Sequence, residues 1–186
     1  MLSIKKDNMP VYSAQKTAEE SGLTKKQIKC YIDFAKEAAR IGGNILMENY
    51  GNLSSIKNKG RLGDLVTNAD TTSEEEILKY LSKSTPTFKV IAEESGTYGH
   101  SSDLAWCIDP LDGTTNYAHG FPFFATSIGL TWKNNPILGA ISVPFFKELY
   151  WAAPGIGAFC NDEVISVSSC KSLDESLLVT GFAYDR

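Results

Sequence analysis

Apolar residues recur at the spacing of one helical face near the start of the chain. The stretch opens at Thr24, and Thr24 and Gln27 fit the pattern of a capping box. Five apolar residues form the stripe that follows: Ile28, Ile32, Ala35, Ala39 and Ile45. Because this spacing puts them on one side of an α-helix, the pattern predicts a helix from about Thr24 to Tyr50, with Gly51 as its stop signal.

The same kind of pattern predicts one further helix and no ordered structure before the first. The letters TSEE at Thr72 again resemble a capping box, so a second helix is expected from about that residue. Ile77, Leu78 and Leu81 would face the core. Residues 1–23 are polar and lack periodicity, which indicates a loose N-terminal arm.

The rest of the chain reads as short strands. Six segments are β-branched or aromatic and are separated by Gly, Pro or Asn: FKVIAE, LAWCID, FFATSIGLTW, PILGAISVP, ELYWAA and GAFC. Their succession through short turns favours an antiparallel meander. Helices followed by many strands predict an α+β fold, with two N-terminal helices packed on a mainly antiparallel sheet. Near the end, SLLVTGF, with Leu177, Leu178 and Val179, reads as one more buried strand.

Composition and charge argue against several classes of protein. The 186 residues carry a net charge of −4, which disfavours a nucleic-acid or anionic-membrane partner. No apolar run is long enough to span a bilayer, and MLSIKKDNMP lacks the apolar region of a signal peptide. Four cysteines without CxxC spacing indicate free buried thiols in a reducing, cytoplasmic setting. With only His100 and His119, zinc sites and Ser-His-Asp chemistry are disfavoured.

Carboxylates gather at three predicted strand ends or adjoining turns. They are Asp64 and Asp70 in GDLVTNAD, Glu93 and Glu94 in IAEES, and Asp109 and Asp112 in IDPLDG. Carboxylates that converge in space repel one another, and some would resist ionising. A divalent cation removes that cost, and Mg²⁺ prefers oxygen ligands and is often shared with a substrate phosphate. Two such ions can clamp the attacking and leaving oxygens of a phosphoryl transfer.

The stretch IDPLDGTTN suits such a site. Its proline fixes the turn, so that Asp109 and Asp112 can face one side, and the Leu111 carbonyl could be a third oxygen ligand. The letters DGTTN would present backbone N–H groups to a phosphate at the start of a short helix. Gly113 allows a close backbone approach, and the Thr114 hydroxyl can orient a water molecule.

Each cluster also has a plain structural interpretation. DPLDG alone is typical of a surface turn, and EES alone is typical of solvated charge. DLVTNAD could be a strand followed by Asp70 as the N-cap of the next helix. The functional interpretation gains from the presence of all three clusters in one chain that has almost no histidine.

Three blocks, GDLVTNAD, IAEES and WCIDPLDGTTNYAHGFPFFATSIGL, resemble the signature blocks of the inositol monophosphatase family of lithium-sensitive, magnesium-dependent phosphatases. The likeness covers most of the chain from about residue 28. It implies a Mg²⁺-dependent hydrolysis of a small phosphate monoester, with inositol monophosphate as the first candidate. Histidinol phosphate, fructose bisphosphate and a 3′-phosphonucleotide remain alternatives.

The resemblance also implies roles for individual residues. Glu93, Asp109, Asp112 and the Leu111 carbonyl match metal ligands of the family. By the same likeness Asp64 pairs with Thr114 to activate the attacking water, with Glu93 as a further catalytic residue. The backbone of Gly113 and Thr114 matches a phosphate contact, to which Glu93, Leu111 and Asp112 add the rest of the substrate site.

One departure from the family concerns length. Family members carry a second α/β lobe with a Trp-Asp motif whose Asp completes the second metal site. Here Trp106, Trp132 and Trp151 are followed by Cys, Lys and Ala. The expected division is therefore an arm (1–23), a metal-binding α+β lobe (24–174) and the first strand of a truncated second lobe (175–186). Such a chain is expected to have low activity and to form a homodimer or otherwise self-associate. The alternative is an inactive fragment that binds a metal or a phosphate.

Overall fold

The computed structural model describes residues 13–53, 55–58 and 65–179. The helices are α1 (Ala14–Glu20), α2 (Lys25–Asn49), α3 (Asn68–Ser84) and α4 (Thr114–Ala118), with 3₁₀ turns at Pro144–Phe146 and Leu173–Glu175. The strands are β1 (Ile56–Asn58), β2 (Leu65–Thr67), β3 (Lys89–Ala92), β4 (Gly96–Gly99), β5 (Leu104–Asp112), β6 (Ala125–Trp132), β7 (Asn135–Val143), β8 (Glu148–Ala153), β9 (Gly157–Cys160) and β10 (Glu163–Val164).

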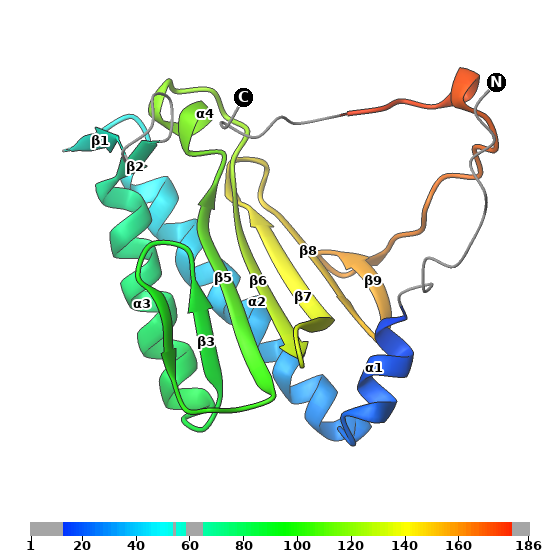
Figure 1. Cartoon of the computed structure of the whole chain (residues 1–186). Coiled ribbons are helices and arrows are strands. Elements are labelled where there is room, and N and C mark those ends of the chain that lie inside the picture. The colour runs from blue at the N-terminus through cyan, green and yellow to red at the C-terminus, as the bar shows by residue number, and fades with distance from the viewer. Residues whose placement is uncertain (1–12, 54, 59–64, 180–186) are drawn as a thin grey trace, which may run out of the picture.

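An eight-stranded sheet in the order β10-β9-β8-β7-β6-β5-β3-β4 forms the body of the molecule (Figure 1). From β5 to β10 each strand pairs antiparallel with the next, which confirms the predicted meander. The one exception is β3, which runs parallel to β5. Because the two strands run in the same direction, the residues that follow them emerge at the same end of the sheet.

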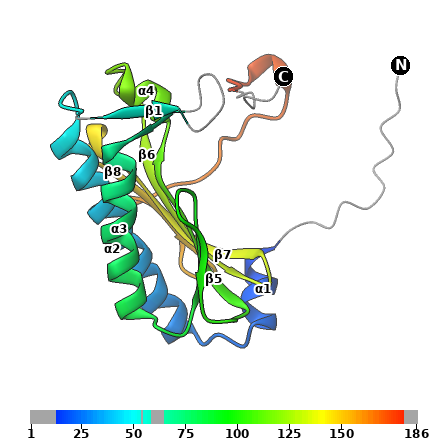
Figure 2. The same ribbon diagram turned by 60° about the vertical axis from the view of Figure 1, so that its left-hand side comes forward.

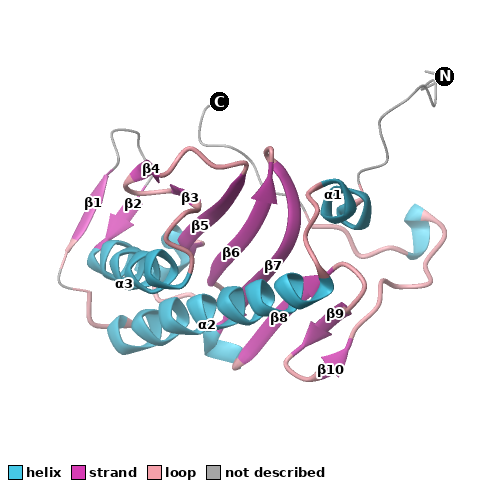
Figure 3. Ribbon diagram, turned by 90° about the horizontal axis from the view of Figure 1, so that it is seen from below, coloured by secondary structure: helices cyan, strands magenta, loops and turns pink. Residues whose placement is uncertain are grey.

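Helices α2 and α3 lie side by side against one face of this sheet (Figures 2 and 3). The predicted apolar stripe of α2 is confirmed, since Ile32, Ala35 and Ala39 are buried in the main core with Trp106 and Ile128 of the sheet. Apolar burial of this kind contributes about 25 cal/mol per Å² removed from water. Helices and a mainly antiparallel mixed sheet together confirm the α+β class.

The helix starts agree with the sequence in one case and correct it in the other. The Thr24 hydroxyl accepts from the Gln27 N–H and the Gln27 side chain accepts from Thr24, which is the predicted capping box. The second long helix begins at Asn68 rather than at Thr72. Thr67 is its N-cap and Asp70 is the reciprocal partner, so TNAD is the box that forms and TSEE lies inside the helix.

Two further expectations are corrected. Part of the segment predicted as a loose arm is helix α1, capped by Ser13, with Ala18 buried against the core; its seven residues are too few to show a periodic stripe. Leu177 and Val179, predicted to lie in a buried strand, are 94% and 93% exposed and belong to no strand. An apolar run forms a strand only where a neighbouring strand pairs with it. Among the described residues, no strand pairs with residues 177–179. Residues 180–182 of that run lie outside them.

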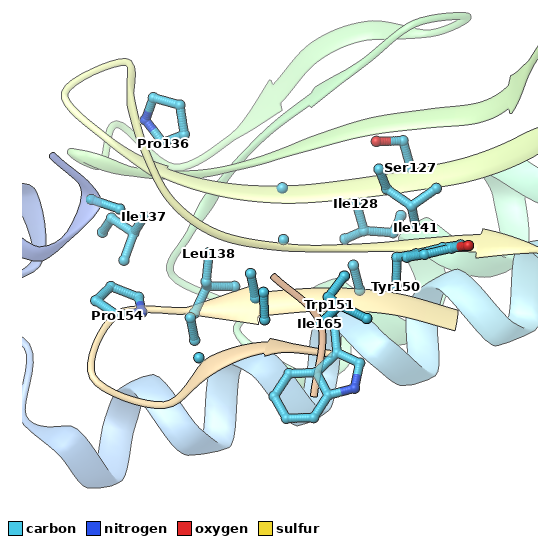
Figure 4. A pocket seen from close by; sticks show the side chains of 18 residues that line it. Ser127, Ile128, Pro136, Ile137, Leu138, Ile141, Tyr150, Trp151, Pro154 and Ile165 are labelled. Atoms are coloured by element: carbon cyan, nitrogen blue, oxygen red, sulfur yellow. The ribbon is translucent and has the colours of Figure 1, made fainter. Parts of the chain in front are cut away.

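A hollow of about 620 Å³ with mostly apolar walls lies along strands β6, β7 and β8. Ile141, Tyr150 and Trp151 are among its lining side chains (Figure 4). All four cysteines are free, and none is fully buried, contrary to expectation. Among the described helices none is both long and apolar enough to cross a membrane.

Trp106 provides a test of the core. Its side chain is fully buried, and its indole N–H donates to the Thr85 hydroxyl at 2.8 Å. In Thr85→Val the indole N–H would stay buried without an acceptor, so the free energy of unfolding is expected to fall by about 1–3 kcal/mol. Denaturant unfolding measures this, with Thr97→Val on exposed β4 as the control. Equal losses in the two variants would contradict the role assigned to the indole hydrogen bond.

Candidate active site

Carboxylates from β3 and β5 meet at the end of the sheet where these parallel strands finish. Ala92 pairs with Ile108, and the Glu93 N–H donates to the Ile108 carbonyl at 3.1 Å. Glu93 therefore lies beside Asp109 across the parallel pair, and the two carboxylates are close enough to repel one another. Burial, and then the neighbouring carboxylates of Glu93 and Asp112, raise the pKa of Asp109 to about 8. The predicted convergence of these two clusters is thus found in the structure.

This arrangement fits a divalent cation, which would relieve the repulsion among the three carboxylates. Glu93 and Asp109 line a hollow of about 310 Å³ together with Cys107 and Ser127. Over the described ranges, however, no three acidic, His or Cys side chains are grouped tightly enough to bind a metal unaided. An ion held here would thus need further oxygen ligands, such as a backbone carbonyl, water or a substrate phosphate.

The turn after Asp109 is held in place by buried hydroxyls. The Pro110 carbonyl accepts from the Ser73 hydroxyl at 3.3 Å and from the Thr126 hydroxyl at 3.0 Å, and both side chains are fully buried. The pairing of β5 with β6 is irregular between Asp109 and Asp112, so the strand bends at this point. The Leu111 N–H donates to Asp109 Oδ1 at 3.1 Å, which orients that carboxylate.

Gly113 links this turn to helix α4 through a conformation that other residues adopt with strain. Its φ is +86°, and an added Cβ would lie 3.0 Å from the Phe123 carbonyl oxygen. The glycine therefore allows the backbones at Gly113 and Phe123 to approach, and it places Thr114 at the first position of α4, while the predicted approach to a phosphate stays a prediction.

Thr114 faces a buried carboxylate from α3. Its hydroxyl lies 3.2 Å from Asp70 Oδ1 and 3.0 Å from the Leu111 carbonyl oxygen, and its single proton can go to either acceptor. The other oxygen of Asp70 accepts from the Thr67 N–H at 2.8 Å and the Thr67 hydroxyl at 2.6 Å. Asp70 is 1% exposed, and burial raises its pKa while these hydrogen bonds lower it in part.

The sequence prediction gave Asp64 as the partner of Thr114. Asp64 lies outside the described residues, so its role stays a prediction; among the residues that the structure describes, the carboxylate that Thr114 contacts is Asp70. From the sequence, Asp70 was expected as a member of the GDLVTNAD acidic cluster or as the N-cap of the next helix, but not as the partner of Thr114. The TNAD capping box could have identified it, because that box places Asp70 in the first turn of α3. Ser73 and Glu74 of the same helix were missed altogether.

Comparisons with known proteins identify the family to which the chain is similar. A family model described as "Inositol monophosphatase family" matches residues 27–186. The chain is 42% identical to the inositol-1-monophosphatase of Synechocystis over 171 residues, which are 91% of this chain and 60% of that protein. It is 44% identical over 159 residues to the fructose-1,6-bisphosphatase/inositol-1-monophosphatase of Aquifex aeolicus, covering 84% of this chain and 60% of that one.

A solved structure shows the same likeness in three dimensions. The inositol monophosphatase of Anabaena superposes with a TM-score of 0.74 at 42% identity, over 84% of this chain and 57% of that one. The chain thus spans about 60% of the length of the curated relatives named above. With the family model matched over most of its length, the chain belongs to the inositol monophosphatase family.

Proposed function

We propose that the protein acts in the Mg²⁺-dependent hydrolysis of a small phosphate monoester, with inositol monophosphate as the first candidate substrate. The observation that carries the proposal is the Thr114–Asp70 contact, which lies next to the turn that bears Asp109 and Asp112. A hydroxyl tied to a buried carboxylate can orient and deprotonate a water molecule. Nearby carboxylates supply the oxygen ligands that Mg²⁺ prefers.

In this proposal the two halves of the site have different tasks. Glu93, Asp109, Asp112 and the Leu111 carbonyl would hold Mg²⁺, which, when bound, polarises a phosphoryl oxygen and lowers the pKa of a water ligand. The Thr114 hydroxyl donates its hydrogen bond to Asp70 Oδ1, so its lone pairs are free to accept from the attacking water. As that water attacks, its proton would pass to Thr114 while the Thr114 proton passes to Asp70.

Asp70 supports that exchange from the opposite side. Its Oδ2 is held by two donors from Thr67, which leaves Oδ1 directed at the Thr114 hydroxyl. The backbone of Gly113 and Thr114 would contact the phosphate, with Glu93, Leu111 and Asp112 completing the substrate site. A cytoplasmic location belongs to the same proposal, as does a boundary between the metal-binding lobe and the start of a second lobe at residues 174–175.

A phosphate-release assay tests the function. The panel would contain inositol monophosphate, fructose bisphosphate, histidinol phosphate and a 3′-phosphonucleotide, each with Mg²⁺ and with a chelator. We expect release that depends on Mg²⁺, is highest with inositol monophosphate and is inhibited by lithium. Preference for fructose bisphosphate would favour the second candidate, which is one of the two activities in the name of the Aquifex relative.

Two forms of the protein should be assayed in parallel. One is the 186-residue chain, and the other is this chain joined to the part of the Synechocystis relative that has no counterpart in it. We expect the joined form to be the more active and the shorter one to self-associate in light scattering. Release from no ester by either form would reject the phosphatase and leave a metal- or phosphate-binding protein.

A further inference from the structure

One face of α3 reaches three separate segments of the candidate site. Asp70 contacts Thr114, Ser73 donates to the Pro110 carbonyl, and Glu74 accepts from the turn after β3. The three residues are at positions i, i+3 and i+4, which lie on one side of a helix. Their exposed fractions are 1%, 0% and 3%, so all three side chains are buried polar groups with specific partners.

Glu74 makes the most constrained of these contacts. Its Oε2 accepts from the Glu94 N–H at 2.8 Å, and its Oε1 accepts from the Ser95 N–H at 2.9 Å. Both oxygens of one buried carboxylate are therefore used on two consecutive backbone amides. Hydrogen bonds to a charged acceptor are roughly twice as strong as neutral ones, and the two-point geometry fixes orientation as well as distance.

The clamped amides belong to the turn that carries Glu93. This turn joins β3 to β4 and comprises Glu93, Glu94 and Ser95. On its other side the Glu93 N–H is bound to the Ile108 carbonyl of β5. The backbone around Glu93 is thus held on both sides. Its own N–H is bound to β5, and the next two N–H groups along the chain are bound to Glu74 of α3. Only the second of these restraints depends on a side chain.

We propose that Glu74 is a positioning residue for the cation site: by clamping the Glu94 and Ser95 amides, it directs the Glu93 carboxylate toward Asp109. The inference rests on the proposed function, since it takes Glu93 and Asp109 as ligands of Mg²⁺. A purely structural Glu74 would support the fold and leave metal affinity alone. A positioning Glu74 also sets metal affinity.

The test compares Glu74→Gln with Glu76→Gln. Glutamine has one acceptor oxygen, so it can keep only one of the two amide bonds, and its NH₂ group would face the other N–H. Glu76 lies on the same helix and makes only an exposed ion pair with Lys79 at 3.6 Å, so its variant removes the same charge without touching the turn. Mn²⁺ binding is measured by calorimetry, and hydrogen exchange is followed at the Glu94 and Ser95 amides.

We expect Glu74→Gln to weaken Mn²⁺ binding by about 10–100-fold, the range seen when a group that orients metal ligands is lost. The two amides should exchange faster, and Glu76→Gln should match the unchanged protein in both measurements. If Glu74→Gln does not fold, Glu74→Asp replaces it, because the shorter carboxylate keeps the charge but cannot span both amides. Unchanged Mn²⁺ affinity in a folded Glu74 variant would overturn the proposal.

The outcome for Glu74 can be separated from the outcome for the proposed function. Mn²⁺ binding that weakens in Glu74→Gln supports the positioning role even if no ester is hydrolysed, in which case only the phosphatase assignment fails. If the protein without any substitution binds no Mn²⁺, both the positioning role of Glu74 and the proposed function are overturned.

Discussion

Replacement of Thr114 by Ala is expected to lower kcat by about 10²–10⁴-fold, the usual contribution of a positioned proton-transfer group. The Thr114 hydroxyl is the group that contacts Asp70 Oδ1, at 3.2 Å, and alanine removes it. Asp70→Asn should have an effect of similar size, because the amide keeps the shape of the side chain but is a poor proton acceptor. Phosphate-release kinetics at saturating substrate measure both variants, made in whichever of the two forms, the 186-residue chain or the joined one, proves active.

A matched variant and a double variant sharpen this result. Thr114→Ser keeps the hydroxyl and should retain most of the activity. Because Thr114 and Asp70 act as one unit, the double variant should lose little more than either single one. Melting temperatures are needed as well, since Asp70 also caps α3. A normal kcat in both single variants would remove this pair from the mechanism.

Asp109→Asn is expected to weaken Mg²⁺ or Mn²⁺ binding by at least about tenfold, or ~1.4 kcal/mol. Loss of a direct ligand should cost no less than loss of a group that only orients one. The metal-free variant should be no less stable than the unchanged protein, for two reasons. Glu93 and Asp112 repel the Asp109 carboxylate, and the asparagine oxygen can still accept from the Leu111 N–H.

Titration calorimetry measures the affinity, and thermal unfolding without metal measures the stability. Asp103→Asn is the control, because Asp103 is an exposed residue just before β5 that pairs with Lys133 at 3.8 Å. Equal affinity in the Asp109 and Asp103 variants would place the cation elsewhere.

Much of the fold follows from local patterns in the chain. The stripe of α2, its capping box and the six main strands are signals carried by neighbouring residues, and the structure confirms them. Strand β4, Gly96–Gly99, was not predicted, because glycine-rich strands carry little propensity and form through their pairing, here with β3. Likewise, the exposure of Leu177 depends on the absence of a covering partner among the described residues, which sequence alone does not display.

The site was predictable where its residues are contiguous. The turn from Asp109 to Thr114 presents its chemistry within six letters, whereas Asp70 contacts Thr114 across 44 positions and Glu74 contacts Glu94 across 20. In the sequence Glu74 looks like an ordinary helix-surface acid, and Asp70 stands out only as a cluster member or helix cap, with nothing to link it to Thr114. Their burial, and hence their importance, follows from the docking of α3 against the end of β5, a tertiary event.

The polar face of α3 also makes the site a cooperative unit. Because Asp70, Ser73 and Glu74 lie about one turn apart on α3, a fluctuation that lifts this part of the helix breaks its contacts with Thr114, Pro110 and the Glu93 turn together. Opening of this turn thus loosens three segments of the site at once, while Pro110 keeps its bond from Thr126 and the Glu93 N–H keeps its bond to Ile108. Heating should therefore abolish cation binding over a narrow range, at the temperature where the first turn of α3 opens, and ahead of the meander from β5 to β9.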